Sequence, residues 1–321
     1  MKTAIAALCV VLALMVGCDD DDCINCPTTN PTLQNIWPNA DQTSWTYDYQ
    51  MREWEGIYTI YPTLGEVPAT PLPNWNEIFN LCESRAPKTP FGITDRVYTM
   101  LFNGTKTTRG GVTAQNLMTA LVVPGQSAGQ VGSDRGSALL QRLYAARPDL
   151  REKILSSLGE MPATPGQIDR SPMLVHGGAW EKTSTYIGTY GDLGQRLSWK
   201  FLTNKLYPGS SFSYQLLPDL DPQLVMRCRV YRSMTVTTPA GTFLKALDCL
   251  YVIDYGISAA LDEYGNPIGF VRTFDYGRVI YAPEIGPVYS YEKWGVEPGT
   301  PPSDGFMDIT IDLTASSTLD Q

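Results

Sequence analysis

The sequence predicts a mainly β protein, an antiparallel meander that forms one curved sheet or open barrel, with a helical insertion near 135–159. Three observations support this fold class. Through most of the chain, β-branched and aromatic residues alternate with polar ones, which is the period of half-buried strands. Glycine, proline, asparagine and aspartate separate these segments at spacings typical of hairpins. In one region the spacing changes to that of a helix.

The expected strands follow one another closely. The first two, Trp45–Tyr49 and Gly56–Tyr61, precede a proline-rich loop at 62–73. Further strands are expected at 96–102, 117–123, 183–189, 197–202, 211–216, 224–236, 243–255, 270–281, 288–294 and 306–313. Short connections between consecutive strands favour antiparallel pairing.

The helical insertion is expected where Leu, Ile and Tyr recur at helical spacing, between Ser137 and Leu158. Pro148 divides this run, and a proline followed by an acid, here Asp149, suits the first turn of a helix. We therefore expect a helical hairpin or a kinked helix between β segments.

Residues 1–17 have the features of a lipoprotein signal peptide. Lys2 precedes an apolar run, Ala4–Val16, that is shorter than the about 20 residues needed to span a bilayer but fits a secretory signal. The run ends in Met15-Val16-Gly17-Cys18, which resembles a bacterial lipobox. On this interpretation the mature chain begins at Cys18, and acyl chains such as palmitate attach it to a membrane.

An acidic tether and linker is expected at 18–35. Asp19–Asp22 repel one another and have nothing to bury, so they do not fold; adjacent carboxylates also lack the alternating spacing of a calcium loop. Cys23 and Cys26 form a CxxC, for which we expect a disulfide, either local or from tether to body. Since there is no second CxxC, zinc is not predicted. The tether leads into a single β-rich domain at 36–297 and a C-terminal strand and tail at 298–321.

A second disulfide is expected between Cys228 and Cys249. The two cysteines flank a hairpin whose turn is Pro239-Ala240-Gly241, and symmetry about that turn places them nearly opposite each other. An exported protein can keep such a bond. A one-residue slip in register would instead turn the two side chains to opposite faces of the sheet.

Composition and motifs argue against several functions. The net charge of −9 disfavours nucleic acid, which is bound through basic patches. A single histidine, His176, is too few for ordinary zinc sites or catalytic triads, and we expect no metal and no cofactor. Gly125-Gln-Ser127-Ala-Gly129 matches a hydrolase nucleophile pattern, but seven further residues separate it from the helix that should follow directly. Hydrolysis at Ser127 is therefore the minor alternative to a protein that is not an enzyme.

Three motifs resemble those of a group of bacterial envelope lipoproteins. They are Thr235-Val-Thr-Thr-Pro-Ala-Gly-Thr-Phe243, Cys249-Leu-Tyr-Val252 and Tyr281-Ala-Pro-Glu-Ile-Gly-Pro-Val288. In that group the hairpin reads VxxPAGTF and the late turn YAPGVGxV, so Glu284-Ile285 departs from the usual Gly-Val. The resemblance implies no catalytic residues, and it implies structural turns at Pro239, Gly241, Pro283 and Gly286. The architecture is also similar to that of half-barrel lipoprotein carriers, which wrap a curved sheet around acyl chains.

Together these features predict a lipid-anchored protein of the bacterial cell envelope, periplasmic or at the cell surface, that binds rather than catalyses. Its expected partners are the membrane, through Cys18, and a hydrophobic or glycan ligand or another envelope protein. The 18 tyrosines and 7 tryptophans, many of them in strands, are the residues suited to such binding. A structural or adhesion role in the envelope is the alternative.

Overall fold

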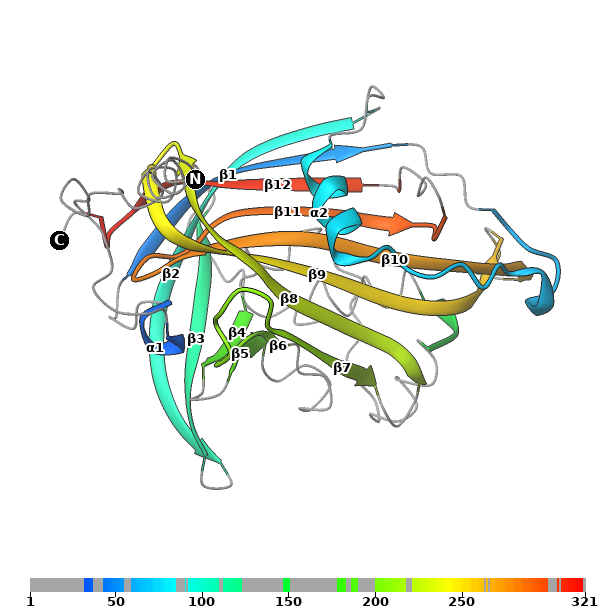
Figure 1. Cartoon of the computed structure of the whole chain (residues 1–321), viewed down its shortest axis with the longest axis horizontal. Coiled ribbons are helices and arrows are strands. Elements are labelled where there is room, and N and C mark those ends of the chain that lie inside the picture. The colour runs from blue at the N-terminus through cyan, green and yellow to red at the C-terminus, as the bar shows by residue number, and fades with distance from the viewer. Residues whose placement is uncertain are drawn as a thin grey trace, which may run out of the picture.

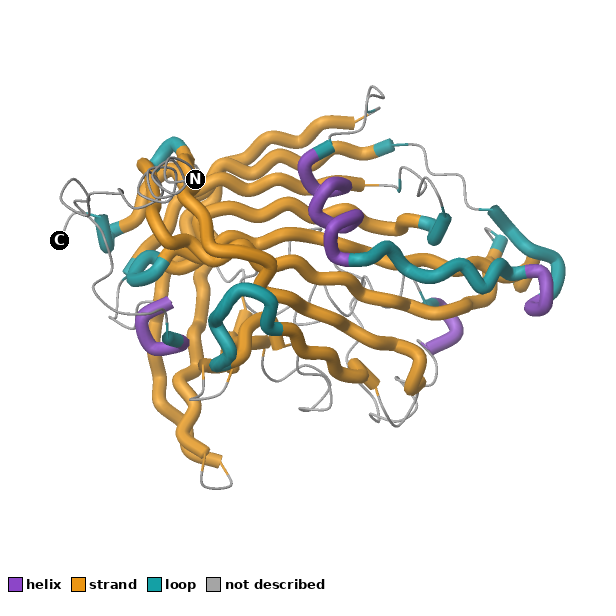
Figure 2. Tube along the Cα trace, in the orientation of Figure 1, coloured by secondary structure: helices purple, strands orange, loops and turns teal. Residues whose placement is uncertain are grey.

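The computed structural model contains one large antiparallel sheet (Figures 1 and 2). It describes residues 32–36, 43–54, 59–84, 90, 92–109, 112–122, 147–150, 178–182, 186–189, 200–217, 221–262, 264, 266–299, 305 and 307–319. The strands are β1 (Ser44–Glu53), β2 (Gly92–Arg109), β3 (Val112–Val122), β4 (Gly178–Lys182), β5 (Tyr186–Thr189), β6 (Lys200–Thr203), β7 (Ser211–Leu217), β8 (Asp221–Thr238), β9 (Gly241–Leu261), β10 (Pro267–Ala282), β11 (Gly286–Val296) and β12 (Met307–Ser316). The helices are α1 (Leu33–Ile36), the 3-10 turn η2 (Leu64–Glu66) and α2 (Trp75–Glu83).

The strand order confirms the expected meander. Across the sheet the order is β6-β5-β4-β3-β2-β1-β12-β11-β10-β9-β8-β7. Each half of the chain therefore runs back and forth between neighbours, and the first and last strands, β1 and β12, join the halves. In Figure 1, β8 to β12 run side by side while β2 and β3 turn down across them, so the sheet is strongly curved.

The two edges of the sheet, β6 and β7, are consecutive in the sequence. They are joined by residues 204–210, and seven residues span at most about 25 Å. The edges therefore lie near each other, although in the described residues the sheet remains open between them. This geometry confirms the predicted curved sheet or open barrel.

Alternation of side chains gives the sheet two buried faces. On β9, Tyr251 and Ile253 belong to the main core, while their neighbours Leu250 and Val252 belong to a second, smaller core. We call these the inner and outer faces. The inner face is lined by aromatic and aliphatic side chains of β1 and β6 to β12, together with α1 and Leu150. The outer face is covered by α2 over β9 to β11 (Figure 1).

Helix α2 was not predicted; it begins just after the proline-rich loop expected at 62–73. Its start is marked by Asn74, whose side chain accepts hydrogen bonds from the backbone of Asn76 and Glu77 while Glu77 bonds back to the backbone of Asn74. This capping box satisfies backbone donors that a helix start leaves open. Ile78 and Cys82, four residues apart, form the buried side of the helix.

The structure changes several expected boundaries. Leu33 and Ile36 are buried in the main core, so the tether ends before residue 33 rather than at 35. The segment 298–321 contains β12, which lies between β1 and β11 in the sheet. The strand expected at 56–61 is wrong in its described part, where Tyr61 alone pairs, as an isolated bridge with Phe270.

Of the helical insertion, only residues 147–150 are described, and 148–150 are helical, with Pro148 first as expected. Among the described residues, no helix is long and apolar enough to cross a membrane.

Candidate functional site

Five of the predicted site residues lie outside the described residues. These are the lipidation site Cys18, the tether cysteines Cys23 and Cys26, and the hydrolase candidates Ser127 and His176. Lipidation, the tether disulfide and the hydrolase alternative therefore stay predictions.

The turn between β8 and β9 lies where it was expected. Pro239 and Ala240 form it, with Thr238 paired to Gly241. Gly241 has φ +142°, a conformation that glycine adopts without strain. Its role is structural.

The turn between β10 and β11 is held by side chains of β1. Pro283, Glu284 and Ile285 connect Ala282 to its strand partner Gly286. The indole nitrogen of Trp45 donates to the carbonyl oxygen of Ile285 at 2.6 Å, and the Tyr47 hydroxyl donates to that of Pro287 at 2.9 Å. Glu284 has φ +67°, a left-handed conformation that favours glycine. Gly286 also has a positive φ, of +102°, so Glu284 occupies one of two positions in this turn at which glycine has a physical advantage.

The disulfide expected between Cys228 and Cys249 is wrong. Both side chains are buried thiols that are not joined to each other. Cys228 lies opposite Tyr251, and Cys249 lies opposite Val230, so the cysteines are offset by two residues on the same face. Diagonal neighbours are separated by about 7–8 Å, whereas a disulfide needs about 4 Å between Cβ atoms. The two register shifts between β8 and β9 cancel, so the pairing of Thr238 with Gly241 at the turn already places Tyr251, and not Cys249, opposite Cys228.

On the inner face, β11 carries polar side chains where apolar ones are expected. Val288 is buried there, and by alternation the next inward positions are Ser290 and Glu292, both with 0% exposure. The strand partners of Ser290 are Val279 and Ile311, both members of the main core. A carboxyl group and a hydroxyl group are thus placed among apolar strand neighbours, where buried polar groups need hydrogen-bond partners.

Tyr251 extends from β9 toward these polar groups. Gly277 on β10 lies directly between Tyr251 and Glu292 in the pairing. A Cβ atom built on Gly277 would lie 2.4 Å from Cζ and 2.5 Å from the hydroxyl oxygen of Tyr251. The end of the tyrosine ring therefore covers Gly277, next to the strand that carries Glu292.

These residues form what we call the inner polar cluster, namely Tyr251, Tyr281, Ser290, Glu292 and Trp294. The indole nitrogen of Trp294 donates to Oε2 of Glu292 at 3.1 Å. Burial raises the pKa of Tyr281 well above its ordinary value, and the neighbouring Cys249, Cys228 and Tyr47 and, least of all, Glu292 raise it further. Tyr281 therefore stays protonated. In the described structure the Ser290 hydroxyl oxygen has no hydrogen-bond partner. The cluster can thus offer hydroxyl and carboxylate groups to the polar end of an otherwise apolar molecule.

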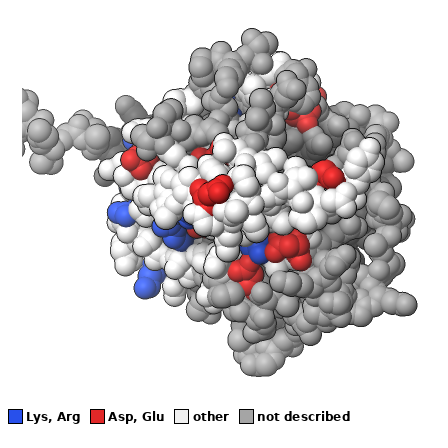
Figure 3. Space-filling model, turned by 90° about the vertical axis from the view of Figure 1, so that its right-hand side faces the viewer, with Lys and Arg blue, Asp and Glu red and all other residues white. Residues whose placement is uncertain are grey.

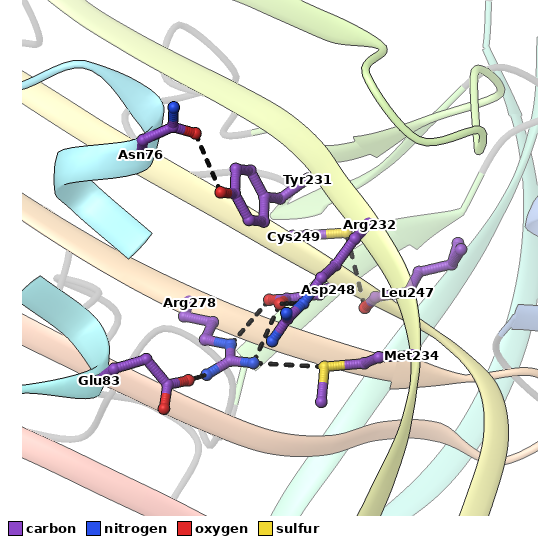
Figure 4. A network of polar contacts seen from close by, with 9 residues as sticks. All are labelled: Asn76, Glu83, Tyr231, Arg232, Met234, Leu247, Asp248, Cys249 and Arg278. Atoms are coloured by element: carbon purple, nitrogen blue, oxygen red, sulfur yellow. Dashed lines mark hydrogen bonds and ion pairs between the residues drawn. The ribbon is translucent and has the colours of Figure 1, made fainter. Parts of the chain in front are cut away.

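The outer face contains a buried ion cluster beneath α2 (Figure 4). Asp248, with 0% exposure, accepts from Nε of Arg278 at 2.7 Å and from Nε of Arg232 at 3.1 Å. Arg278 also forms an ion pair with Glu83 at the end of α2. The Phe79 ring of α2 lies under both guanidinium groups, with its centroid 4.5 Å from Cζ of Arg232 and 5.2 Å from that of Arg278. Burial lowers the pKa of Arg278, but hydrogen bonds and charges from Asp248 and Glu83 outweigh this effect and raise it.

The outer cluster is best explained as the clamp that holds α2 on the sheet. Tyr231 reinforces it by donating to Oδ1 of Asn76 at 2.9 Å (Figure 4). Its charges are satisfied by one another, so they are not available to a ligand. Within the described ranges, no group of three or more His, Cys, Asp or Glu side chains could hold a metal ion.

Both clusters were missed in the sequence. The sequence does contain a pattern that could have revealed the inner cluster. On the strand predicted at 288–294, Ser290 and Glu292 lie two and four residues after Val288, so all three side chains point to the same face. For the outer cluster, Asp248 and Arg278 are 30 residues apart, and strand register alone brings them together.

Comparison with known proteins gives two distant structural similarities. No protein-family model matches the chain, and no curated protein matches it. A candidate exported protein of Bacteroides fragilis with a YmcC-like fold aligns with a TM-score of 0.36 and 10% identity, over 88% of this chain and 99% of that one. A candidate lipoprotein of Parabacteroides distasonis aligns with a TM-score of 0.34 and 9% identity, over 90% and 100%. We draw no functional conclusion from similarities this distant.

Proposed function

We propose that this chain is a lipid-anchored protein of the bacterial cell envelope that binds a hydrophobic molecule on the inner face of its curved sheet. The proposed ligand carries a hydroxyl or amine group, and the chain acts on it by binding alone. The observation that carries the proposal is the inner polar cluster, where Glu292 and Ser290 are fully buried among aromatic and aliphatic side chains.

The proposal of an envelope location rests on the sequence. The apolar run ending in Cys18 fits a lipoprotein signal, and the acidic residues that follow fit a tether between membrane and body. Replacement of Cys18 by serine would remove the thiol that receives lipid. We expect the Cys18→Ser chain to lose the mass of the acyl chains and to leave the membrane pellet under high salt. Retention of acyl mass would contradict anchoring at this residue.

The proposal of an inner ligand rests on chemistry. Apolar binding sites combine a hydrophobic lining with a few convergent polar groups that fix the orientation of the ligand. Trp45, Tyr47 and Tyr49 of β1 supply such a lining, and Glu292 and Ser290 supply the polar groups. A carboxylate held in apolar surroundings favours a ligand group that donates hydrogen bonds, and for this reason we propose a hydroxyl or an amine.

Native mass spectrometry of the full chain, extracted from its own host with mild detergent, tests this proposal. We expect a bound molecule at near one-to-one ratio, in addition to the covalent anchor. In a Glu292→Gln, Ser290→Ala double variant the bound fraction should fall about tenfold, since each lost hydrogen bond to a charged or buried group costs about 1–3 kcal/mol. Glu66→Gln, which changes an exposed acid, is the matched control and should keep the ligand. Absence of a bound molecule from the unchanged chain, or an equal bound fraction in the double variant, would refute the proposal.

A further inference from the structure

The tip of the β9–β10 hairpin carries a group of exposed apolar side chains. Eight large hydrophobic residues are exposed in the described part of the chain, and five of them belong to this tip and the segment beside it: Ile60, Leu64, Leu261, Tyr264 and Ile268. We call these five the tip patch. Tyr264, in the turn itself, is 81% exposed. Isolated exposed apolar residues are ordinary, but a group of them marks an interaction surface.

The tip patch is held in a defined shape. Tyr61 and Phe270 exchange backbone hydrogen bonds of 2.9 and 2.8 Å, which attach the segment before η2 to the hairpin. A Cβ atom on Gly269 would lie 2.5 Å from Cγ2 of Ile60, so the two backbones approach closely. In the turn, Oδ1 of Asp262 accepts from the backbone nitrogens of Tyr264 and Asn266 at 2.9 and 2.8 Å. A surface ordered before binding loses little conformational entropy when a partner arrives.

The two segments that carry the tip patch have charges of one sign. Residues 59–70 and 259–270 contain Glu66, Asp262 and Glu263 and no lysine or arginine. Arg272, just beyond, is engaged by the carbonyl oxygen of Thr70 at 2.7 Å and by Asp254 at 3.4 Å. Figure 3 looks onto this end of the molecule, where uncharged surface runs across the middle with acidic side chains on it, while basic side chains lie toward the left and beside acidic ones below. Anionic lipid is repelled by such a rim, whereas Lys and Arg on a partner are attracted.

The tip patch also lies far from the start of the body. In Figure 1, α1, where the described chain begins, and the end of the β9–β10 hairpin lie toward opposite ends of the long axis. β9 alone has 21 residues, a length of about 70 Å at strand rise. With an anchor at Cys18, which is part of the proposed function, the tip can therefore point away from the membrane that holds the chain.

We infer that the tip patch is a docking surface for a protein partner, and that the partner presents an apolar surface flanked by Lys and Arg. The apolar residues supply the buried contact, with Tyr264 as its centre, because exposed aromatic residues dominate binding energy at interfaces. The acidic residues select the partner and speed its approach. This inference does not depend on the inner ligand, so either can fail without the other.

Site-specific photo-crosslinking tests it in the native host. A benzophenone amino acid replaces Tyr264 in the full, anchored chain, and the adduct is mapped to the peptide of the partner by mass spectrometry. We expect one discrete protein adduct whose contact region combines apolar residues with Lys or Arg. Its yield should fall about tenfold with Ile268→Ser or Glu66→Lys, as for loss of one central contact. Leu64→Ser is a second truncation in case Ile268→Ser fails to fold.

The same crosslinker at Tyr207 is the matched control, because this residue is also exposed but lies on the connection between β6 and β7. It should not give the same adduct. Four results would overturn the inference: no adduct at Tyr264, an adduct to lipid, an adduct to a second copy of this chain, or a contact region without basic residues. If Glu66→Lys left the adduct yield unchanged, the acidic residues would not select the partner by charge.

Discussion

Replacing Gly277 by alanine tests the packing on which the inner face depends. The added methyl group would lie 2.4–2.5 Å from three atoms of the Tyr251 ring, closer than such atoms approach in proteins. Tyr251 is only 3% exposed, so the ring has little room to move. Overpacking of a tight core costs about 1–3 kcal/mol, and we expect a value near the upper end.

Thermal unfolding followed by circular dichroism is the assay. A loss of about 3 kcal/mol lowers the Tm of a chain of this size by roughly 4–5 °C, since the unfolding entropy is about 2.1 cal/mol/K per residue. Gly65→Ala is the matched control, because a Cβ atom there meets nothing within 4 Å, and its unfolding free energy should change by less than about 0.5 kcal/mol.

A double-mutant cycle identifies the cause. If the clash with Tyr251 is responsible, Gly277→Ala should cost less than about 1 kcal/mol in a Tyr251→Leu background, since leucine lacks the outer ring atoms. Equal losses in both backgrounds, or a Gly277→Ala chain as stable as Gly65→Ala, would show that the tyrosine does not cover the glycine.

Further predictions concern the second turn, the outer cluster and the thiols. Glu284→Gly should raise the unfolding free energy by about 0.5–1 kcal/mol in urea titrations. The change removes a left-handed strain of about 1–2 kcal/mol, and the greater conformational entropy of glycine in the unfolded chain offsets part of this gain. A loss of stability would contradict this. Asp248→Asn should cost about 3 kcal/mol, as for breaking a buried ion pair, whereas Asp95→Asn on the exposed face of β2 should cost under about 0.5 kcal/mol; similar losses would mean that the cluster does not clamp α2. Burial raises the pKa of the thiols of Cys82, Cys228 and Cys249. Their contribution to the unfolding free energy is therefore fully present below the unfolded-state pKa of about 8.5. It is lost as the pH rises above that value, by about 1.4 kcal/mol per pH unit for each thiol. Urea titrations under reducing conditions between pH 8.5 and 10 should show this slope, and a chain with all three thiols replaced by alanine should lose it; equal slopes would refute the assignment.

The sequence by itself determined the strands and most of their turns. Alternation in Trp45–Tyr49 predicts β structure because successive side chains of a strand point to opposite faces, and Phe243–Tyr255 is rich in residues that favour strands. Pro239 and Gly241 mark a turn because their backbone preferences are local properties. Short connections between most consecutive strands predict the antiparallel meander, which the strand order confirms; the connections from β1 to β2 and from β3 to β4 are long.

Pairing and burial depended on the tertiary structure. The register of β8 on β9 pairs Cys228 with Tyr251, and this offsets Cys228 from Cys249 although the turn between them was predicted. The contact of Asp248 with Arg278 and Glu83 joins three segments whose meeting leaves no local pattern. The burial of Glu292 likewise requires the neighbouring strands to close around it. Local backbone preference is encoded residue by residue, whereas register and burial are set by which distant strands pack together, and only the folded sheet decides that.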